Sequence, residues 1–393
     1  MKKPLLTIGM PVYKGGRKEG TLLTRCLESL MSQTFRDFKV IIANNDSPDN
    51  TEGIIYNTVR HDKRFEYHRN TINYGYFPNA LGLVANCDTK YYAMLHFDSY
   101  YAPTYAEKCV KALENDSQAV LAYSYCQFVD EDNKFFDIYK DLISFDQADP
   151  AERYLNILKK MGWCTAYHGV IRQDVLVKHL FRTASTDNAA FDNELLALLA
   201  LEGKFLQINA PLFYRLKDTY QDKGETAEAH HRRLFAKGTY RPHPVKLPYC
   251  NFISDHCFDI LYSSLPAEKK DYLIQNTILA LLQRYDTLIN GELSRLIDAI
   301  VSGNFRYDEL DPEEVSSGNF KLLDYYILSK LLKELSFAFV LKPTFPKLNL
   351  ALAFIYMYLG RHKEALFYVE QELLLTPQDA LCLTLKEKLS QKV

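Results

Sequence analysis

Three polar clusters near the start of the sequence have side chains that can bind a polar ligand. They occupy residues 11–13, 44–46 and 96–98, and each directly follows an apolar segment. If these segments are neighbouring parallel strands, the clusters meet at the carboxyl ends of the strands, where open sheets bind ligands. The alternative is that polar residues simply end each strand.

The segments that would position these clusters follow two alternating patterns. Short apolar runs predict β-strands, and apolar residues at helical spacing predict helices. The strands are expected at 5–10, 40–43, 65–67, 91–95 and 119–125, and the helices at 22–31 and 79–85. The first strand is expected to stop at Pro11. Strands that alternate with helices predict an α/β layer with a mostly parallel sheet.

The composition excludes several classes of protein. With 393 residues, the chain is long enough for two or three domains and a large core. Its 47% hydrophobic and 24% charged residues exclude a wholly disordered chain, a collagen and a small disulfide scaffold. The net charge of −2 provides no global field for holding nucleic acid, so we expect no nucleic-acid partner.

Cysteines and apolar runs predict a cytoplasmic protein. The eight scattered cysteines form no CxxC and no zinc-like spacing with histidine, which predicts reduced, mostly buried thiols. The start of the sequence has no signal-peptide pattern, and the apolar run at 350–359 is too short to cross a bilayer.

The sequence is rich in tyrosine. Its 28 Tyr fit clefts that bind sugars or nucleobases, although half-buried packing explains them as well.

The pattern changes at about residue 219. Residues 219–246 are polar, and from 230 onward they are basic without an acidic residue. They are expected to form a linker, a lid over phosphates, or a contact with anionic lipid head groups. Residues 247–393 show helical spacing, including 272–285 and 325–340. These features predict a separate helical domain.

Residues 350–377 resemble one tetratricopeptide (TPR) hairpin. The matching positions are Leu352, Tyr356, Gly360, Ala365, Leu373 and Pro377. Glu372 departs from the pattern, which expects a small residue there. Because one repeat does not bury its own face, we interpret this hairpin as the end of a helical bundle, with a docking surface as the alternative.

Residues 1–218 resemble a family 2 glycosyltransferase with the GT-A fold, through the order and spacing of several motifs. These are the Pro-Val-Tyr turn at 11–13, the helix ending in Gln33-Thr34-Phe35, the loop at 44–51, Arg69-Asn70 with Asn73, Gly75 and Asn79 beyond, the strand before 96–98, and the acidic helix at 187–205. The resemblance implies a Rossmann-like, mostly parallel sheet with helices on both faces, followed by the all-α region.

The resemblance also implies a donor side for a nucleotide-sugar. Its residues would be Pro11, Tyr13, Asn44, Asp46, Asn79, His96, Phe97, Asp98, Arg215 and Lys217. Asn44 stands where the family usually has an Asp that accepts the N3 hydrogen of uracil. Its amide oxygen still accepts, but without charge. Asp46 is an alternative base contact, and a capped turn is the alternative interpretation of 44–49.

A divalent cation is the cofactor that the resemblance implies. Asp98 falls on the position that binds the cation bridging the diphosphate, and His96 replaces the first acid of the family's Asp-x-Asp. The metal ligands would be Asp98 and His96, with Mn²⁺ favoured over Mg²⁺ because imidazole tolerates Mn²⁺ better. The alternative is that His96 is a hydrogen-bonded pocket residue that touches no metal.

The catalytic base implied by the resemblance is Asp192, located by counting back from Gly203. One carboxylate near the acceptor hydroxyl would take its proton in an inverting transfer. Asp192 can also cap the helix that follows, and Asp187 and Glu194 are the alternative bases. Arg215 and Lys217 would hold the diphosphate, although Lys217 fits a surface charge equally well.

The acceptor side would contain Trp163, Tyr167 and His168, with ordinary packing as the alternative for Trp163. We therefore predict an inverting glycosyltransferase that moves a sugar, from a UDP-sugar by preference, to a glycan, lipid-linked or protein acceptor. The resemblance places it in bacterial surface polysaccharide or glycoconjugate synthesis, at the inner face of the membrane through a peripheral membrane or protein partner of the C-terminal region. The alternatives are a catalytically degenerate module with a helical interaction region and a sugar nucleotidyltransferase, for which residues 14–20 resemble a phosphate loop.

Overall fold

The computed structural model describes residues 3–139, 145–162, 164–183, 191–217, 247–302 and 320–393. The chain divides into two compact units, residues 1–241 and 242–393, and each is described by itself. The expected basic linker or lid at 219–246 lies outside the described residues. Its boundaries therefore stay predictions.

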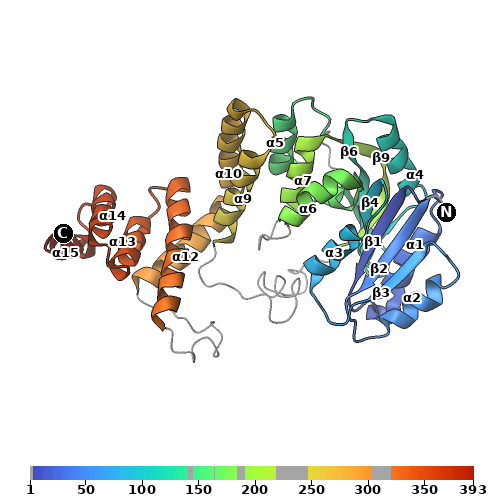
Figure 1. Ribbon diagram of the computed structural model, residues 1–393, viewed down its shortest axis with the longest axis horizontal. Coiled ribbons are helices and arrows are strands. Elements are labelled where there is room, and N and C mark those ends of the chain that lie inside the picture. The colour runs from blue at the N-terminus through green and yellow to red at the C-terminus, as the bar shows by residue number, and fades with distance from the viewer. Residues whose placement is uncertain (1–2, 140–144, 163, 184–190, 218–246, 303–319) are drawn as a thin grey trace. The chain divides into compact units, whose positions relative to one another are not determined.

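The first unit contains a mixed sheet of nine described strands (Figure 1). They are β1 (Leu6–Val12), β2 (Phe38–Asn44), β3 (Phe65–Arg69), β4 (Tyr91–Met94), β5 (Ser99–Tyr101), β6 (Ala119–Val129), β7 (Phe135–Tyr139), β8 (Val170–Arg172) and β9 (Lys204–Leu216). Their order is β3-β2-β1-β4-β8-β6-β9-β5, with β7 beside β6. The first four are mutually parallel, as are β6 and β9, whereas β5, β7 and β8 run antiparallel to their neighbours.

Helices cover both faces of this sheet. They are α1 (Thr21–Met31), α2 (Thr51–Val59), α3 (Tyr76–Ala85), α4 (Tyr105–Asn115), α5 (Pro150–Lys160), α6 (Gln173–Thr183) and α7 (Phe191–Glu202), with short 3₁₀ turns η1 (Arg17–Gly20) and η2 (Thr165–His168). Side chains of α1, α2 and α4 share one apolar cluster with Leu6, Ile8 and Met10 of β1. Helix α3 contacts β1 and α6 without joining that cluster, so it covers the opposite face. The predicted α/β fold is confirmed.

The first strand does not stop at Pro11, as the sequence had suggested. β1 continues to Val12, and Pro11 pairs in register with Ala43 of β2. The pairing with β4 ends at Gly9, so β1 has one neighbour at Pro11. Proline is tolerated at such a one-sided position because the ladder there lacks the bond that its missing N–H would have made.

The described part of the second unit contains only helices. They are α9 (Pro248–Tyr262), α10 (Ala267–Val301), α12 (Phe320–Leu341), α13 (Leu348–Tyr358), α14 (His362–Leu375) and α15 (Ala380–Ser390). The buried Glu292 of α10 accepts the N–H groups of Tyr249 and Cys250 at 3.1 and 2.9 Å. A carboxylate from another helix thus satisfies the first turn of α9, where N–H groups lack helical partners and the dipole favours negative charge. The predicted all-α region is confirmed.

Helices α13 and α14 form the expected hairpin, with Gly360 between them, and α15 packs onto it. Glu372, the departure from the TPR pattern, is buried, and its carboxylate accepts the N–H of Lys347 at 3.2 Å, directly before α13. The acid therefore binds the start of the neighbouring helix where a small residue would leave that N–H open. Membership of the TPR family stays a prediction.

Two further expectations concern cysteines and apolar helices. All eight cysteines are free, and all but Cys257 are buried, as predicted. Within the described ranges, we find no helix with both the length and the hydropathy needed to cross a bilayer.

Gly9 marks a close approach inside the sheet layer and yields a test of the packing. A Cβ at Gly9 would lie 2.0 Å from the hydroxyl oxygen and 2.7 Å from Cζ of the buried Tyr92. We expect Gly9→Ala to lower the free energy of unfolding by about 1–3 kcal/mol because the core is overpacked. Gly82→Ala is the control, since its Cβ would meet nothing within 4 Å and helix α3 would gain about 0.5–1 kcal/mol. Urea titration measures both, and equal stability of the two variants would contradict this packing.

Candidate functional site

The three polar clusters lie at one edge of the sheet. Strands β1, β2 and β4 are parallel neighbours, and they end at Val12, Asn44 and Met94. Because the carboxyl ends of parallel strands share an edge, the segments 11–13, 44–46 and 96–98 follow one another there. The site is built from loops that this edge holds.

The loop after β1 is attached to the loop after β2 by backbone hydrogen bonds. The N–H groups of Lys14, Gly15 and Gly16 donate to Ser47 Oγ at 3.0 Å, to Thr51 Oγ1 at 2.9 Å and to Asp49 Oδ2 at 2.9 Å. A phosphate loop presents such N–H groups to its ligand. Here side chains of the protein accept them, which argues against the nucleotidyltransferase alternative.

Asn44 is buried, and both atoms of its amide have partners within the protein. Its Oδ1 accepts the N–H of Ser47 at 3.0 Å, and its Nδ2 donates to the hydroxyl of Tyr67 at 3.0 Å. The neighbouring Asp46 has a left-handed φ of 55° and pairs with Arg69 at 3.0 Å. The Asn44 amide oxygen thus closes a turn with Ser47, and the base contacts of Asn44 and Asp46 stay predictions.

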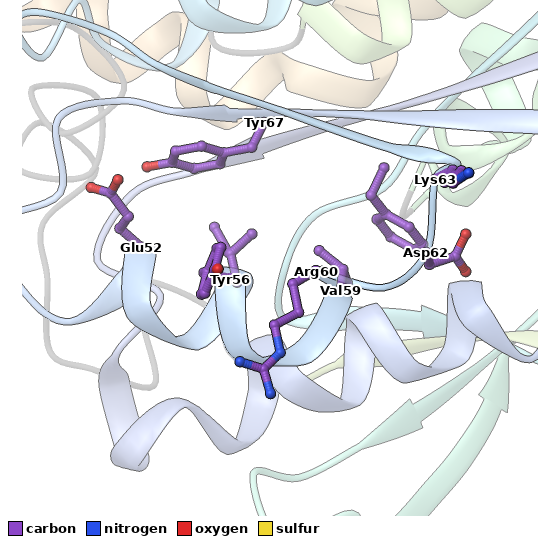
Figure 2. A pocket seen from close by; sticks show the side chains of 9 residues that line it. Glu52, Tyr56, Val59, Arg60, Asp62, Lys63 and Tyr67 are labelled. Atoms are coloured by element: carbon purple, nitrogen blue, oxygen red, sulfur yellow. The ribbon is translucent and has the colours of Figure 1, made fainter.

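Tyr67 also lines a pocket between α2 and β3, with Glu52, Tyr56 and Arg60 among its neighbours (Figure 2). Figure 2 shows the Tyr67 hydroxyl facing the carboxylate of Glu52. Burial raises the pKa of Tyr67, so the hydroxyl keeps its proton while it accepts from Asn44. This pocket lies behind the edge strand, and its lining includes none of the predicted site residues.

Asn79 belongs to a network of amides that fixes the segment before α3. Its Oδ1 accepts from Asn70 Nδ2 at 2.9 Å, and its Nδ2 donates to the carbonyl of Ala43 at 3.0 Å. Asn45 accepts from Asn70 at 2.9 Å and donates to the carbonyl of Gly75 at 2.9 Å. These bonds hold a turn in which Gly75 has a φ of 84°, and α3 begins at the next residue.

His96 contacts Tyr76, a residue that the sequence did not single out. His96 Nε2 lies 2.9 Å from the Tyr76 hydroxyl. Desolvation lowers the pKa of His96 to about 4; the charge of Asp98 opposes this shift and that of Arg215 adds to it. The imidazole is therefore neutral near pH 7. Phe97 packs against the core, and the Arg17 guanidinium lies 5.8 Å from its ring centre.

The residues at this edge fit a divalent cation only in part. Nowhere in the described segments do three or more His, Cys, Asp or Glu side chains gather as a metal group. Mg²⁺ in phosphate-transfer sites is held by one or two carboxylates and completed by substrate phosphates. Asp98 fits that role, because it is partly exposed beside the end of β4. His96 fits less well, since its Nε2 already has a partner in Tyr76.

Asp192 lies in the first turn of α7, where Oδ1 accepts the N–H of Asn193 at 2.9 Å. Burial raises the pKa of its carboxyl, while the Arg215 guanidinium and the Cys164 thiol favour the ionised form. Of the alternative bases, Glu194 is 1% exposed within α7, and Asp187 lies outside the described residues. Asp192 is both a helix-start residue and a carboxyl with a raised pKa.

Arg215 is the charge that connects the parts of the site. It pairs in register with Ser99 on β5, directly after Asp98. Its charge lowers the pKa values of Asp192, His96 and His168, so its guanidinium acts on three different segments. Lys217 is exposed, and its ammonium lies 5.7 Å from the ring centre of Phe136. Among the described residues, we find no hydrogen bond or ion pair between the Lys217 side chain and another predicted site residue, and its role stays a prediction.

The acceptor-side residues Tyr167 and His168 lie in η2. The Tyr167 hydroxyl is 3.2 Å from that of Tyr76, and burial raises the pKa of Tyr167. His168 is buried, and its Nδ1 lies 3.0 Å from the carbonyl of Met94, so Nδ1 carries the proton. The acceptor role of His168 stays a prediction. Trp163 lies outside the described residues.

Comparison with known proteins agrees with this geometry. Residues 7–176 match the family model of glycosyl transferase family 2. An uncharacterized glycosyltransferase of Methanocaldococcus jannaschii is 32% identical over 142 residues, which are 36% of this chain and 48% of that protein. A Campylobacter jejuni protein named GalNAc(5)-diNAcBac-PP-undecaprenol β-1,3-glucosyltransferase is 29% identical over 77 residues, 20% of this chain and 23% of that one. The chain thus spans less than half the length of these relatives.

Solved structures show the same fold. The crystal structure of Staphylococcus aureus TarS residues 1–349 superposes with a TM-score of 0.54 at 11% identity, covering 95% of this chain and 92% of that one. The TarS complex with UDP-GlcNAc gives the same TM-score, at 12% identity and with the same coverage. At this identity the likeness establishes the architecture alone.

The buried amide of Asn44 gives a stability test for this edge. We expect Asn44→Ala to lower the free energy of unfolding by about 1–3 kcal/mol, because the Ser47 N–H loses its buried acceptor. Asn57→Ala is the control, because Asn57 is exposed in the middle of α2 and alanine is the better helix former. Urea unfolding measures both, and an Asn44→Ala variant as stable as the control would refute this role of the amide.

Proposed function

We propose that this protein is an inverting glycosyltransferase that uses a nucleotide-sugar donor. The observation that carries the proposal is electrostatic: the Arg215 charge acts on the Asp192 carboxyl, and Arg215 pairs in register with Ser99, the residue directly after Asp98. It supports a site in which a carboxyl with a raised pKa and a cation act together with the Asp98 carboxylate at the ligand-binding edge of an α/β sheet. An acceptor hydroxyl and a departing diphosphate need these two kinds of group.

The proposed reaction is a single displacement. The acceptor oxygen attacks the anomeric carbon as the bond to the diphosphate oxygen breaks, and the hydroxyl proton passes to the Asp192 carboxylate. Arg215 then stabilises the charge that develops on the leaving diphosphate, because a guanidinium binds phosphate oxygens in a bidentate fashion. Attack opposite the leaving group inverts the anomeric centre.

Asp98 would hold a divalent cation, Mn²⁺ or Mg²⁺, together with the donor diphosphate. Such an ion, when bound, supplies Lewis-acid neutralisation of the leaving group. Asp98 supports this part of the proposal because a hard cation prefers carboxylate oxygen as a ligand.

A UDP-sugar is the donor we favour, with hexosyl transfer as the reaction. TarS, which shares the fold, has been crystallised with UDP-GlcNAc, and the Campylobacter relative is named for a lipid-linked acceptor. We extend the proposal to a glycan, lipid-linked or protein acceptor in surface polysaccharide or glycoconjugate synthesis. A membrane or protein partner of the second unit, at the cytoplasmic face, is part of the same proposal.

The alternative is a degenerate transferase domain that recruits a partner. Both amide atoms of Asn44 have protein partners, and His96 replaces an acid, so the donor side departs from the family at two positions. The experiments below separate the two functions because only the transferase binds a donor nucleotide.

Nucleotide binding is the first test. We expect one of UDP, GDP, dTDP and CDP to raise the melting temperature in the presence of Mn²⁺, since a ligand of the folded state stabilises it by mass action. Asp98→Ala should remove the Mn²⁺-dependent part of the shift. Asp174→Ala, an exposed acid in the first turn of α6, should retain it. No shift with any nucleotide would favour the recruiting module.

Asp192 is tested by rate and pH. We expect Asp192→Asn to slow sugar transfer by about 10²–10⁴-fold, the contribution of a general base, while nucleotide binding persists. Because burial raises the Asp192 pKa, the rate should fall with decreasing pH at values above the ordinary aspartate pKa of 3.8. The rate falls toward low pH because the Asp192 carboxyl accepts a proton only when it is ionised.

Measuring nucleoside diphosphate release against pH gives both results. Asp174→Asn is the matched control and should keep the wild-type rate and profile. A normal rate in Asp192→Asn would remove Asp192 from the mechanism.

A further inference from the structure

Tyr76 lies where the donor and acceptor parts of the proposed site come together. It is the first residue of α3, directly after the turn that Gly75 makes possible. Its hydroxyl is 2.9 Å from His96 Nε2, which follows β4, and 3.2 Å from the Tyr167 hydroxyl in η2. One oxygen thus joins three segments that are far apart in the sequence.

The chemistry of these three groups sets the direction of both hydrogen bonds. A phenol is a much stronger acid than a neutral imidazole N–H, so the best donor is a tyrosine and the best acceptor is the bare imidazole nitrogen. Tyr76 therefore donates its single proton to His96 Nε2. The Tyr76 oxygen then accepts a hydrogen bond from the Tyr167 hydroxyl. In this arrangement both hydroxyl protons are donated, one to His96 Nε2 and one to the Tyr76 oxygen.

The rings around His96 leave it one orientation. The His96 ring meets the Tyr76 ring edge-on at 5.3 Å and the His168 ring edge-on at 4.8 Å. His168 is itself fixed by its Nδ1–H to the carbonyl of Met94. A rotation that frees His96 Nε2 must therefore break the bond to Tyr76 and disturb two ring contacts.

We propose that Tyr76 is a positioning residue that holds His96 as its Nδ1–H tautomer, so that His96 serves as a hydrogen-bonding residue and the cation is held without it. The inference rests on the proposed function for the presence of a cation site. In this inference, Asp98 and the donor phosphates are the ligands of the cation. Tyr76 hydrogen-bonds both to His96 on the donor side and to Tyr167 on the acceptor side.

Nitrogen spectroscopy tests the tautomer without any substrate. Long-range proton–nitrogen correlation of the full chain, labelled with ¹⁵N-histidine at pH 8, distinguishes a protonated ring nitrogen from a bare one. His96→Gln identifies the His96 signals among the ten histidines. We expect Nδ1 protonated and Nε2 bare in the wild type.

Tyr76→Phe removes the hydroxyl and keeps the ring. We expect the ratio of the Nδ1–H to the Nε2–H form of His96 to fall about tenfold, the factor that the loss of one hydrogen bond produces. Tyr74→Phe is the matched control, since the Tyr74 hydroxyl is exposed and lies 3.3 Å from that of Thr71, and its spectrum should equal the wild type. An Nε2–H form in the wild type, or a ratio unchanged in Tyr76→Phe, would overturn the inference.

The role toward the cation is read separately. In thermal-shift binding of UDP with Mn²⁺, His96→Gln should keep the Mn²⁺-dependent shift that Asp98→Ala loses. Loss of that shift in both variants would make His96 a ligand and overturn the assignment. If none of UDP, GDP, dTDP and CDP binds the wild-type protein, the proposed function fails, while the tautomer spectra still decide the role of Tyr76.

Discussion

The structure depends on one constraint at the edge where β1, β2 and β4 end. Past the last paired residue, the buried N–H and carbonyl groups of the connecting loops have no strand to bond, and leaving them unpaired is costly. Side-chain amides and hydroxyls take the place of that strand. Four side-chain amides hydrogen-bond to these loops and in part to one another: those of Asn44, Asn45, Asn70 and Asn79. The loop after β1 donates its N–H groups to the side chains of Ser47, Thr51 and Asp49. The positions of Asn44 and Asn79 among the candidate site residues follow from these bonds.

At the proposed site, burial and a nearby charge act on the pKa values in opposite directions for Asp192 and in the same direction for His96. Burial raises the pKa of Asp192 and lowers that of His96, so both groups tend toward their neutral forms. Arg215 acts on both: it favours ionised Asp192 and opposes protonated His96. A single guanidinium on β9 thus favours the charged form of the Asp192 carboxyl and the uncharged form of the His96 imidazole.

The core of the fold could be predicted because parallel strands are buried on both faces and read as apolar runs. The common location of the three polar clusters could also be predicted, because the carboxyl ends of neighbouring parallel strands lie at the same edge of the sheet. Tyr76 could not be predicted, because its contacts depend on how α3, β4 and η2 meet, and no local pattern carries that information. The His-x-Asp spacing likewise does not show which ring nitrogen is occupied. Pro11 and Glu372 broke local rules, and in each case a neighbouring element explains the residue: an unpaired side of β1 and the open start of α13.

The attachment of the loop after β1 to the loop after β2 has a consequence for ligand capture. Three consecutive N–H groups, from Lys14 to Gly16, are held by side chains of the other loop. These bonds couple the two loops, so that one loop moves independently of the other only if the bonds break. A ligand bound at this edge of the sheet would meet loops that are already ordered, so little of their conformational entropy would be lost on binding. Removal of the Ser47 or Thr51 hydroxyl would then increase the entropic cost of binding at this edge, although neither side chain need touch the ligand.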